Sequence, residues 1–149
     1  MKQHVASITC YAVLLLAGPT AAQAAANVQE GQWESTVEMK MEIPGMPFAM
    51  PPMKFTSTDC LSQDDLVPKT GRKDQRCEIR NRQISGNKVT WESVCVDKDG
   101  TTEGQGKVTY SGNSYQGIMR ARMIPRDRSA QATKVDYTLS GRYLGGCKR

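Results

Sequence analysis

Apolar and polar side chains alternate along most of the chain, most clearly over residues 32–43. One face of that segment carries Trp33, Val37, Met39, Met41 and Ile43, and the other carries Glu34, Glu38, Lys40 and Glu42. A period of two residues is typical of a β-strand with one buried face. The proline-rich stretch 44–52 ends this strand, because proline donates no ladder hydrogen bond. We expect a second strand over 54–60.

A β-hairpin is predicted between Cys77 and Cys95, with its turn at 85–87 ("SGN"). Gly and Asn tolerate the positive φ angles that hairpin turns require. If the strands pair symmetrically about this turn, Cys77 lies opposite Cys95, and Arg80 lies opposite Glu92. Directly opposed residues of an antiparallel pair come close enough for a disulfide. The register therefore predicts the disulfide Cys77–Cys95.

A second hairpin is predicted to turn at Gly112-Asn113, a favoured two-residue connection. It places Tyr110 opposite Tyr115, and a last strand follows over 134–143. The expected inward-facing residues of these strands are Val108, Tyr110, Tyr115, Met119, Ala121, Met123, Val135, Tyr137, Leu139 and Tyr143.

The predicted fold is all-β. Six or seven antiparallel strands follow one another in sequence, each with one apolar face, so the meander must curl over its own core. Glycines inside the predicted strands mark bends where a sheet can coil. We expect a strongly curved sheet or a small up-and-down barrel with two disulfides, and one short helical turn at 62–65 before Pro68.

Four cysteines follow residue 24: Cys60, Cys77, Cys95 and Cys147. No two of them have the C-x-x-C spacing of a redox or zinc site. With Cys77 and Cys95 paired, the second disulfide is Cys60–Cys147. It closes a loop of about 88 residues and contributes on the order of 4–5 kcal/mol in the chain-entropy model, against about 3 kcal/mol for the hairpin bridge.

The first 24 residues have the features of a secretory signal peptide. Lys2 precedes an apolar run over 5–18, and Ala22-Gln23-Ala24 resembles a cleavage site. We expect cleavage there, one β-rich domain over 25–149, and a periplasmic or secreted protein. After residue 24 no apolar segment approaches the ~20 residues that cross a bilayer, so no membrane span is expected.

The only histidine, His4, would be removed with the signal peptide. The cleaved chain could then form no Ser-His-Asp or Cys-His catalytic site and no imidazole metal site. Removal of Lys2 leaves 19 Lys and Arg against 15 Asp and Glu, a charge of +4. The arginines predicted on outward strand faces stand among Glu78 and Glu92, which favours a solvated face over a nucleic-acid surface. Anionic lipid headgroups, or another envelope polyanion, are the alternative partner for that face. We expect no enzymatic activity and no nucleic-acid partner.

The stretch 41–53, "MEIPGMPFAMPPM", is rich in methionine and proline. Met39 and Met41 share the face of Trp33 and are expected in the core. The residues left for ligand or partner contact are Met46, Phe48, Met50 and Met53. Methionine forms adaptable apolar surfaces, and proline lowers the entropy lost when a loop docks.

Copper(I) is the alternative ligand of this stretch. Soft thioether sulfur suits Cu(I), and Met46, Met50 and Met53 have a spacing that permits convergence on one ion. No other cofactor is expected.

Several short motifs together resemble a known family. They are Gly31-x-Trp33-Glu34, "IPGMP", "MPPM", Cys60-Leu61 and a closing "SGRYLGGC". In this order they are similar to the bacterial exported family called domain of unknown function 3617. The resemblance implies export, paired cysteines and a β-rich domain, and it implies no catalytic residue. We expect a non-catalytic envelope protein that binds an apolar or amphipathic ligand, or a partner protein, through the methionine- and proline-rich loop.

Overall fold

The computed structural model describes residues 26–48, 50–70, 74–127 and 129–147. The predicted signal peptide lies outside the described residues. Seven β-strands, and no helix, are formed by the described part of the chain. They are β1 (Gly31–Glu42), β2 (Met53–Leu61), β3 (Arg76–Ser85), β4 (Lys88–Val96), β5 (Gly100–Tyr110), β6 (Ser114–Pro125) and β7 (Thr133–Gly145).

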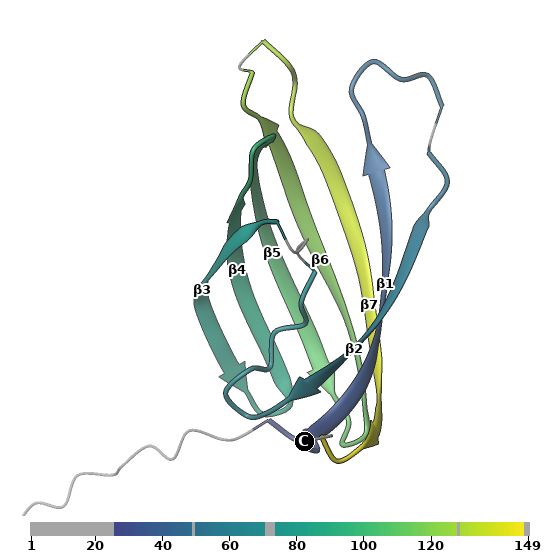
Figure 1. The fold of residues 1–149 in the computed structure, drawn as a ribbon, viewed down its shortest axis with the longest axis vertical. Helices are drawn as coiled ribbons and strands as arrows, with labels where there is room; N and C mark the ends of the chain where they lie inside the picture. Colours follow the sequence, from purple (N-terminus) through teal and green to yellow (C-terminus); the bar gives the residue numbers. More distant parts are fainter. Residues whose placement is uncertain (1–25, 49, 71–73, 128, 148–149) are drawn as a thin grey trace, which may run out of the picture.

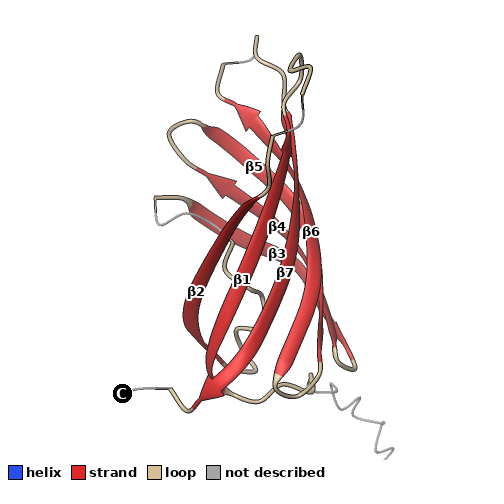
Figure 2. Cartoon of the chain, turned by 90° about the vertical axis from the view of Figure 1, so that its right-hand side faces the viewer, coloured by secondary structure: helices blue, strands red, loops and turns tan. Residues whose placement is uncertain are grey.

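All seven strands belong to one antiparallel sheet in the order β2-β1-β7-β6-β5-β4-β3. The sheet coils into an open half-barrel, with β2 and β3 as its free edges (Figures 1 and 2). The predicted meander and curved sheet are confirmed, and the barrel alternative is not formed. Closure would require β2 to pair with β3, and the segment that joins these strands lies between them instead (Figure 1).

Both predicted hairpins are confirmed, one with a change of register. Cys77 lies opposite Cys95 and Arg80 lies opposite Glu92, as expected. Between Arg80 and Gln83 the register shifts by one residue at a bulge. The bulge allows the two-residue turn at Gly86-Asn87 and the opposition of Cys77 to Cys95 in one hairpin. It also interrupts the free edge of the sheet.

The described residues between β2 and β3, 62–70 and 74–75, cross the concave side of the sheet and are called the crossing segment below (Figure 1). The helical turn predicted at its start is wrong: the Asp65 N–H donates to the Ser62 carbonyl at 3.1 Å in a single turn. Leu66 is then completely buried against the sheet. The Tyr110 hydroxyl donates to the Leu66 carbonyl at 2.7 Å, which fixes the extended crossing backbone. Burial of Leu66 at this point competes with continuation of a helix.

Aromatic rings fill the part of the concave face below this crossing. Trp33 packs against Tyr110, Tyr115 and Tyr143 with ring centroids 6.2, 5.8 and 5.9 Å away. The Tyr115 hydroxyl donates to Ser35 Oγ at 2.8 Å. Burial is the main cause that raises the pKa of Tyr115 above its usual value.

Glycine makes room for two of the large rings. A Cβ on Gly141 would overlap the Tyr115 ring, and a Cβ on Gly106 would overlap the Trp91 ring. Aromatic side chains that cover glycines on neighbouring strands are a known device for coiling a sheet.

Both predicted disulfides are confirmed. Cys77–Cys95 joins β3 to β4, and Cys60–Cys147 joins β2 to the chain just after β7. The second bond therefore spans β1, which lies between β2 and β7 in the sheet.

The two disulfides provide a first prediction. Replacement of Cys60 and Cys147 by Ala should lower the free energy of unfolding by about 4–5 kcal/mol, and replacement of Cys77 and Cys95 by about 3 kcal/mol, because the larger loop restricts the unfolded chain more. Urea titrations followed by circular dichroism measure both. A hairpin variant less stable than the long-loop variant would contradict this ranking.

Candidate functional site

Above the aromatic cluster, the concave face is not filled. A cleft of about 530 Å³ lies there, between the sheet and the crossing segment. Its lining comprises Val37, Met39, Met41, Met53, Phe55, Thr56, Ser57, Lys69, Thr70, Gln75, Cys95, Thr102, Met119, Met123 and Tyr137. Five of these residues are methionines. The volume is within the usual range of about 300–1,000 Å³ for small-molecule sites.

The sheet wall of the cleft is a continuous row of side chains across four strands. Met53 on β2 lies opposite Met39 on β1, Met39 lies opposite Tyr137 on β7, and Tyr137 lies opposite Met119 on β6. Successive side chains of a strand point to opposite faces, so these paired residues share the concave face. The row is an apolar, sulfur-rich floor.

The opposite wall is polar and comes from the crossing segment. The Thr70 hydroxyl lies 3.5 Å from Met119 Sδ, within the range of a weak hydrogen bond, which places this wall over the Met119 end of the row. Lys69 Nζ lies 3.6 Å from the Asp65 carboxylate. Gln75 donates its amide to Asp97 Oδ2 at 2.7 Å. The cleft thus has one apolar and one polar side.

Of the four predicted loop residues, Met53 alone lines this cleft. The connection between β1 and β2 runs beyond one end of the sheet (Figure 1). Its residues Met46 and Phe48 are 40% and 66% exposed. Met50 belongs to the same connection and is half-buried. The loop therefore extends past one end of the sheet, and the cleft is built mainly by strands.

Sequence reasoning assigned the strand methionines to the core. Met39 and Met41 do share the face of Trp33, yet they are only half-buried and line the cleft. Met119 and Met123 were likewise expected to face inward, without a role in binding. Alternation identifies the inner face but not whether a second layer covers it. The available signal was the choice of methionine where branched aliphatic residues usually pack a sheet.

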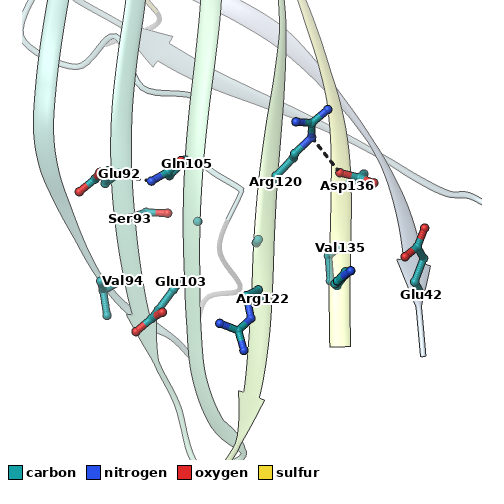
Figure 3. Close-up of a pocket in the computed structure, with 13 residues that line it drawn as sticks. Glu42, Glu92, Ser93, Val94, Glu103, Gln105, Arg120, Arg122, Val135 and Asp136 are labelled. Carbon is teal, nitrogen blue, oxygen red and sulfur yellow. Dashed lines mark hydrogen bonds and ion pairs between the residues drawn. The ribbon is translucent and has the colours of Figure 1, made fainter. Parts of the chain in front are cut away.

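The outer face of the sheet has a second hollow of about 630 Å³, lined mainly by charged residues (Figure 3). Arg120 points toward Asp136, with Nε 3.6 Å from Oδ1. Gln105 donates to Glu92 at 3.3 Å, and Asn81 donates to the same carboxylate at 2.6 Å. Opposite charges on neighbouring strands thus pair across this surface, as expected for a solvated sheet face.

Other ionisable groups of the outer face also form exposed pairs. Arg142 donates to Glu34 at 2.7 Å, and this hydrogen bond lowers the pKa of the Glu34 carboxyl. Arg80 lowers the pKa of Glu78 in the same way. Within the described ranges, no three His, Cys, Asp or Glu side chains are grouped as a metal site would need.

Comparison with family models gives one match. The model described as "Protein of unknown function (DUF3617)" covers residues 28–147. The chain belongs to the DUF3617 family. That match includes all seven strands and all four bridged cysteines, so the half-barrel and its cleft lie inside the DUF3617 region. Searches of curated proteins and of solved structures found no match.

Two features of this DUF3617 chain concern its environment. Its two disulfides are typical of proteins outside the cytosol, where thiols are not kept reduced. In the part of the chain that the structure describes, no helix has the length and apolar character needed to span a bilayer.

A second prediction compares how much a cleft residue and a core residue contribute to the free energy of unfolding. Met53→Ser should lower the free energy of unfolding by less than about 1 kcal/mol, because Met53 is already partly solvated. Leu139→Ala should cost about 2–5 kcal/mol, because Leu139 is only 1% exposed and leaves a cavity. Urea titration measures both variants. Equal losses would show that Met53 packs as a core residue.

Proposed function

We propose that this protein is an exported, non-catalytic binding protein that holds an apolar or amphipathic small molecule in the methionine-lined cleft. The observation that carries the proposal is the cleft itself. It is already open on the concave face, it is bounded by apolar strand side chains on one side, and it has polar groups on the other.

The chemistry of the lining supports binding rather than catalysis. Among the described lining residues, the side chains that can ionise are Lys69 and Tyr137, and Cys95 is held in a disulfide. This lining contains no carboxylate, imidazole or free thiol to act as a general base or nucleophile. Thioether side chains, by contrast, adapt to flexible apolar ligands.

Export is supported by two independent features. Residues 1–24 have the charged start, apolar run and small-residue cleavage site of a signal peptide. The two disulfides need an oxidising compartment to persist. We propose the periplasm, or the exterior of the cell, as the place of function.

The loop beyond β1 and β2 contributes a second contact. Met46 and Phe48 expose apolar side chains at the end of the strands that supply Met39 and Met53 to the cleft. We propose that the loop touches an envelope partner or the end of a bound ligand, while the cleft supplies most of the affinity.

Binding of a neutral fluorescent probe, N-phenyl-1-naphthylamine, tests whether the cleft or the loop supplies most of the affinity. The double variant Met39→Gln, Met53→Gln should weaken probe binding about tenfold or more, because each substitution replaces apolar contact with a polar amide. The matched loop variant Met46→Ser, Phe48→Ser should change binding by less than about threefold. If the loop variant binds the probe more weakly than the cleft variant, the binding site lies at the loop. No loss in either variant would refute the proposal.

Copper(I) is the second candidate, favoured by the direct opposition of Met39 and Met53 in the β1–β2 register. Two thioethers on paired positions stand close enough to share a soft ion, and a third methionine such as Met46 or Met50 would have to complete the site.

Leucine variants distinguish the two candidates. Met39→Leu, Met53→Leu keeps the apolar surface and removes the sulfur. If the cleft holds an apolar ligand, this variant should bind the neutral probe within about threefold of the unsubstituted protein, because volume and hydrophobicity are conserved. If it holds Cu(I), competition with a Cu(I) chelator should show retention by the unsubstituted protein at mildly acidic pH, and loss of retention in the variant. Absence of Cu(I) retention by the unsubstituted protein would exclude copper.

A further inference from the structure

We infer that the ligand of the cleft is a single-chain anionic amphiphile, a long-chain carboxylate, with its chain along the methionine row and its head group at Lys69. This inference rests on the proposed function and specifies its ligand. It comes from the distribution of charge and polarity over the two walls of the cleft.

Lys69 is the only charged residue among the described residues that line the cleft. It comes from the crossing segment, so it belongs to the polar wall opposite the apolar floor, and its exposed ammonium stands at the border of the cleft. A cation at the border of an apolar site favours an anionic head group, and the attraction grows as the bound ligand displaces water. A cationic or neutral amphiphile receives no such contribution.

Neutral hydrogen-bonding groups stand beside this charge. Thr70 and Gln75 belong to the same wall, and both line the cleft. The contact of the Thr70 hydroxyl with Met119 Sδ joins the polar wall to one end of the methionine row. Sulfur is a weak acceptor, so a carboxylate oxygen would be the stronger partner for this hydroxyl.

The ion pair of Lys69 with Asp65 does not satisfy the ammonium group. Nζ and Oδ2 are 3.6 Å apart, and the two side chains remain 63% and 48% exposed. Exposed pairs of this kind contribute about 0–1 kcal/mol. A ligand carboxylate can therefore share the Lys69 ammonium with Asp65, or replace Asp65 as its partner. Asp97, in the connection between β4 and β5, accepts the amide of Gln75.

The length of the floor fits one acyl chain. The row from Met53 to Met119 crosses β2, β1, β7 and β6, and three strand spacings give about 14 Å. The hydrocarbon core of a bilayer is about 30 Å thick and contains two layers of chains, so one acyl chain reaches about 15 Å. The row is thus about as long as one chain of a membrane lipid.

The test compares three amphiphiles with the same sixteen-carbon chain: hexadecanoate, hexadecanol and hexadecyltrimethylammonium. Displacement of the neutral probe from the full exported chain measures each affinity below micelle-forming concentrations. We expect hexadecanoate to bind about two- to fivefold more tightly than hexadecanol, and the cation to bind weakest. The preference for hexadecanoate should shrink as salt is raised, because exposed charges are screened.

Three variants assign the preference to Lys69. Lys69→Glu should abolish the preference for hexadecanoate and favour the cation, with hexadecanol unchanged. Asp65→Asn should strengthen hexadecanoate binding, because it removes the competing carboxylate. Lys107→Glu is the matched control, since Lys107 is an exposed lysine on the outer face of β5. It should leave the order of the three amphiphiles unchanged.

The outcomes separate this inference from the proposed function. Equal binding of all three amphiphiles, in both the unsubstituted protein and Lys69→Glu, would overturn the anionic ligand and leave an apolar cleft. Failure of every amphiphile and of the probe to bind would overturn both. Capture of a diacyl anionic lipid from vesicles, with hexadecanoate excluded, would overturn the single-chain ligand. Circular dichroism and intact disulfides confirm that each variant is folded.

Discussion

The organisation of this protein depends on one constraint: a single curved sheet has an apolar concave face, and the described residues form no second sheet or helix to cover it. The described chain offers one segment for that purpose, the connection between β2 and β3. It buries Leu66 over the aromatic cluster, and the hydrogen bond from Tyr110 holds it there. On the side of the crossing segment that carries Trp33, the concave face is a packed core. On the side that carries Met39 and Met53, the same face is exposed enough to form the methionine-lined cleft.

The residue types follow this division. Trp33, Tyr110 and Tyr115 occupy the covered part, where the two tyrosine hydroxyls find partners in the Leu66 carbonyl and the Ser35 hydroxyl. Methionine occupies the open part, where a flexible and polarisable side chain can lie against neighbours when the cleft is empty and rearrange around a ligand. The outer face carries paired charges instead. Three environments thus share one sheet, and each has its own chemistry.

Much of the fold could be predicted from the sequence because it depends on local patterns. Alternation located the strands, and the turn at Gly112-Asn113 set the register of β5 and β6. The hairpin register likewise identified Cys77–Cys95. The bulge near Asn81 was missed because the predicted pairing was centred on residue 86, whereas Ser85 pairs with Lys88 across Gly86-Asn87. The path of the crossing segment could not be predicted, because it depends on contacts far apart in sequence, such as that of Tyr110 with Leu66. The cleft was missed for the same reason: Met39 and Met41 look like core residues until the covering segment is placed.

The bond between Cys60 and Cys147 has a mechanical consequence. It ties β2 to the end of β7, and β1 runs between them as the strand nearest the N-terminus. Chain ends ordinarily fray first, and the loss of order then spreads inward. In this sheet β1 is paired with β2 and with β7. The disulfide keeps these two neighbours together, so a β1 strand that frays still has both partners in place when it pairs again.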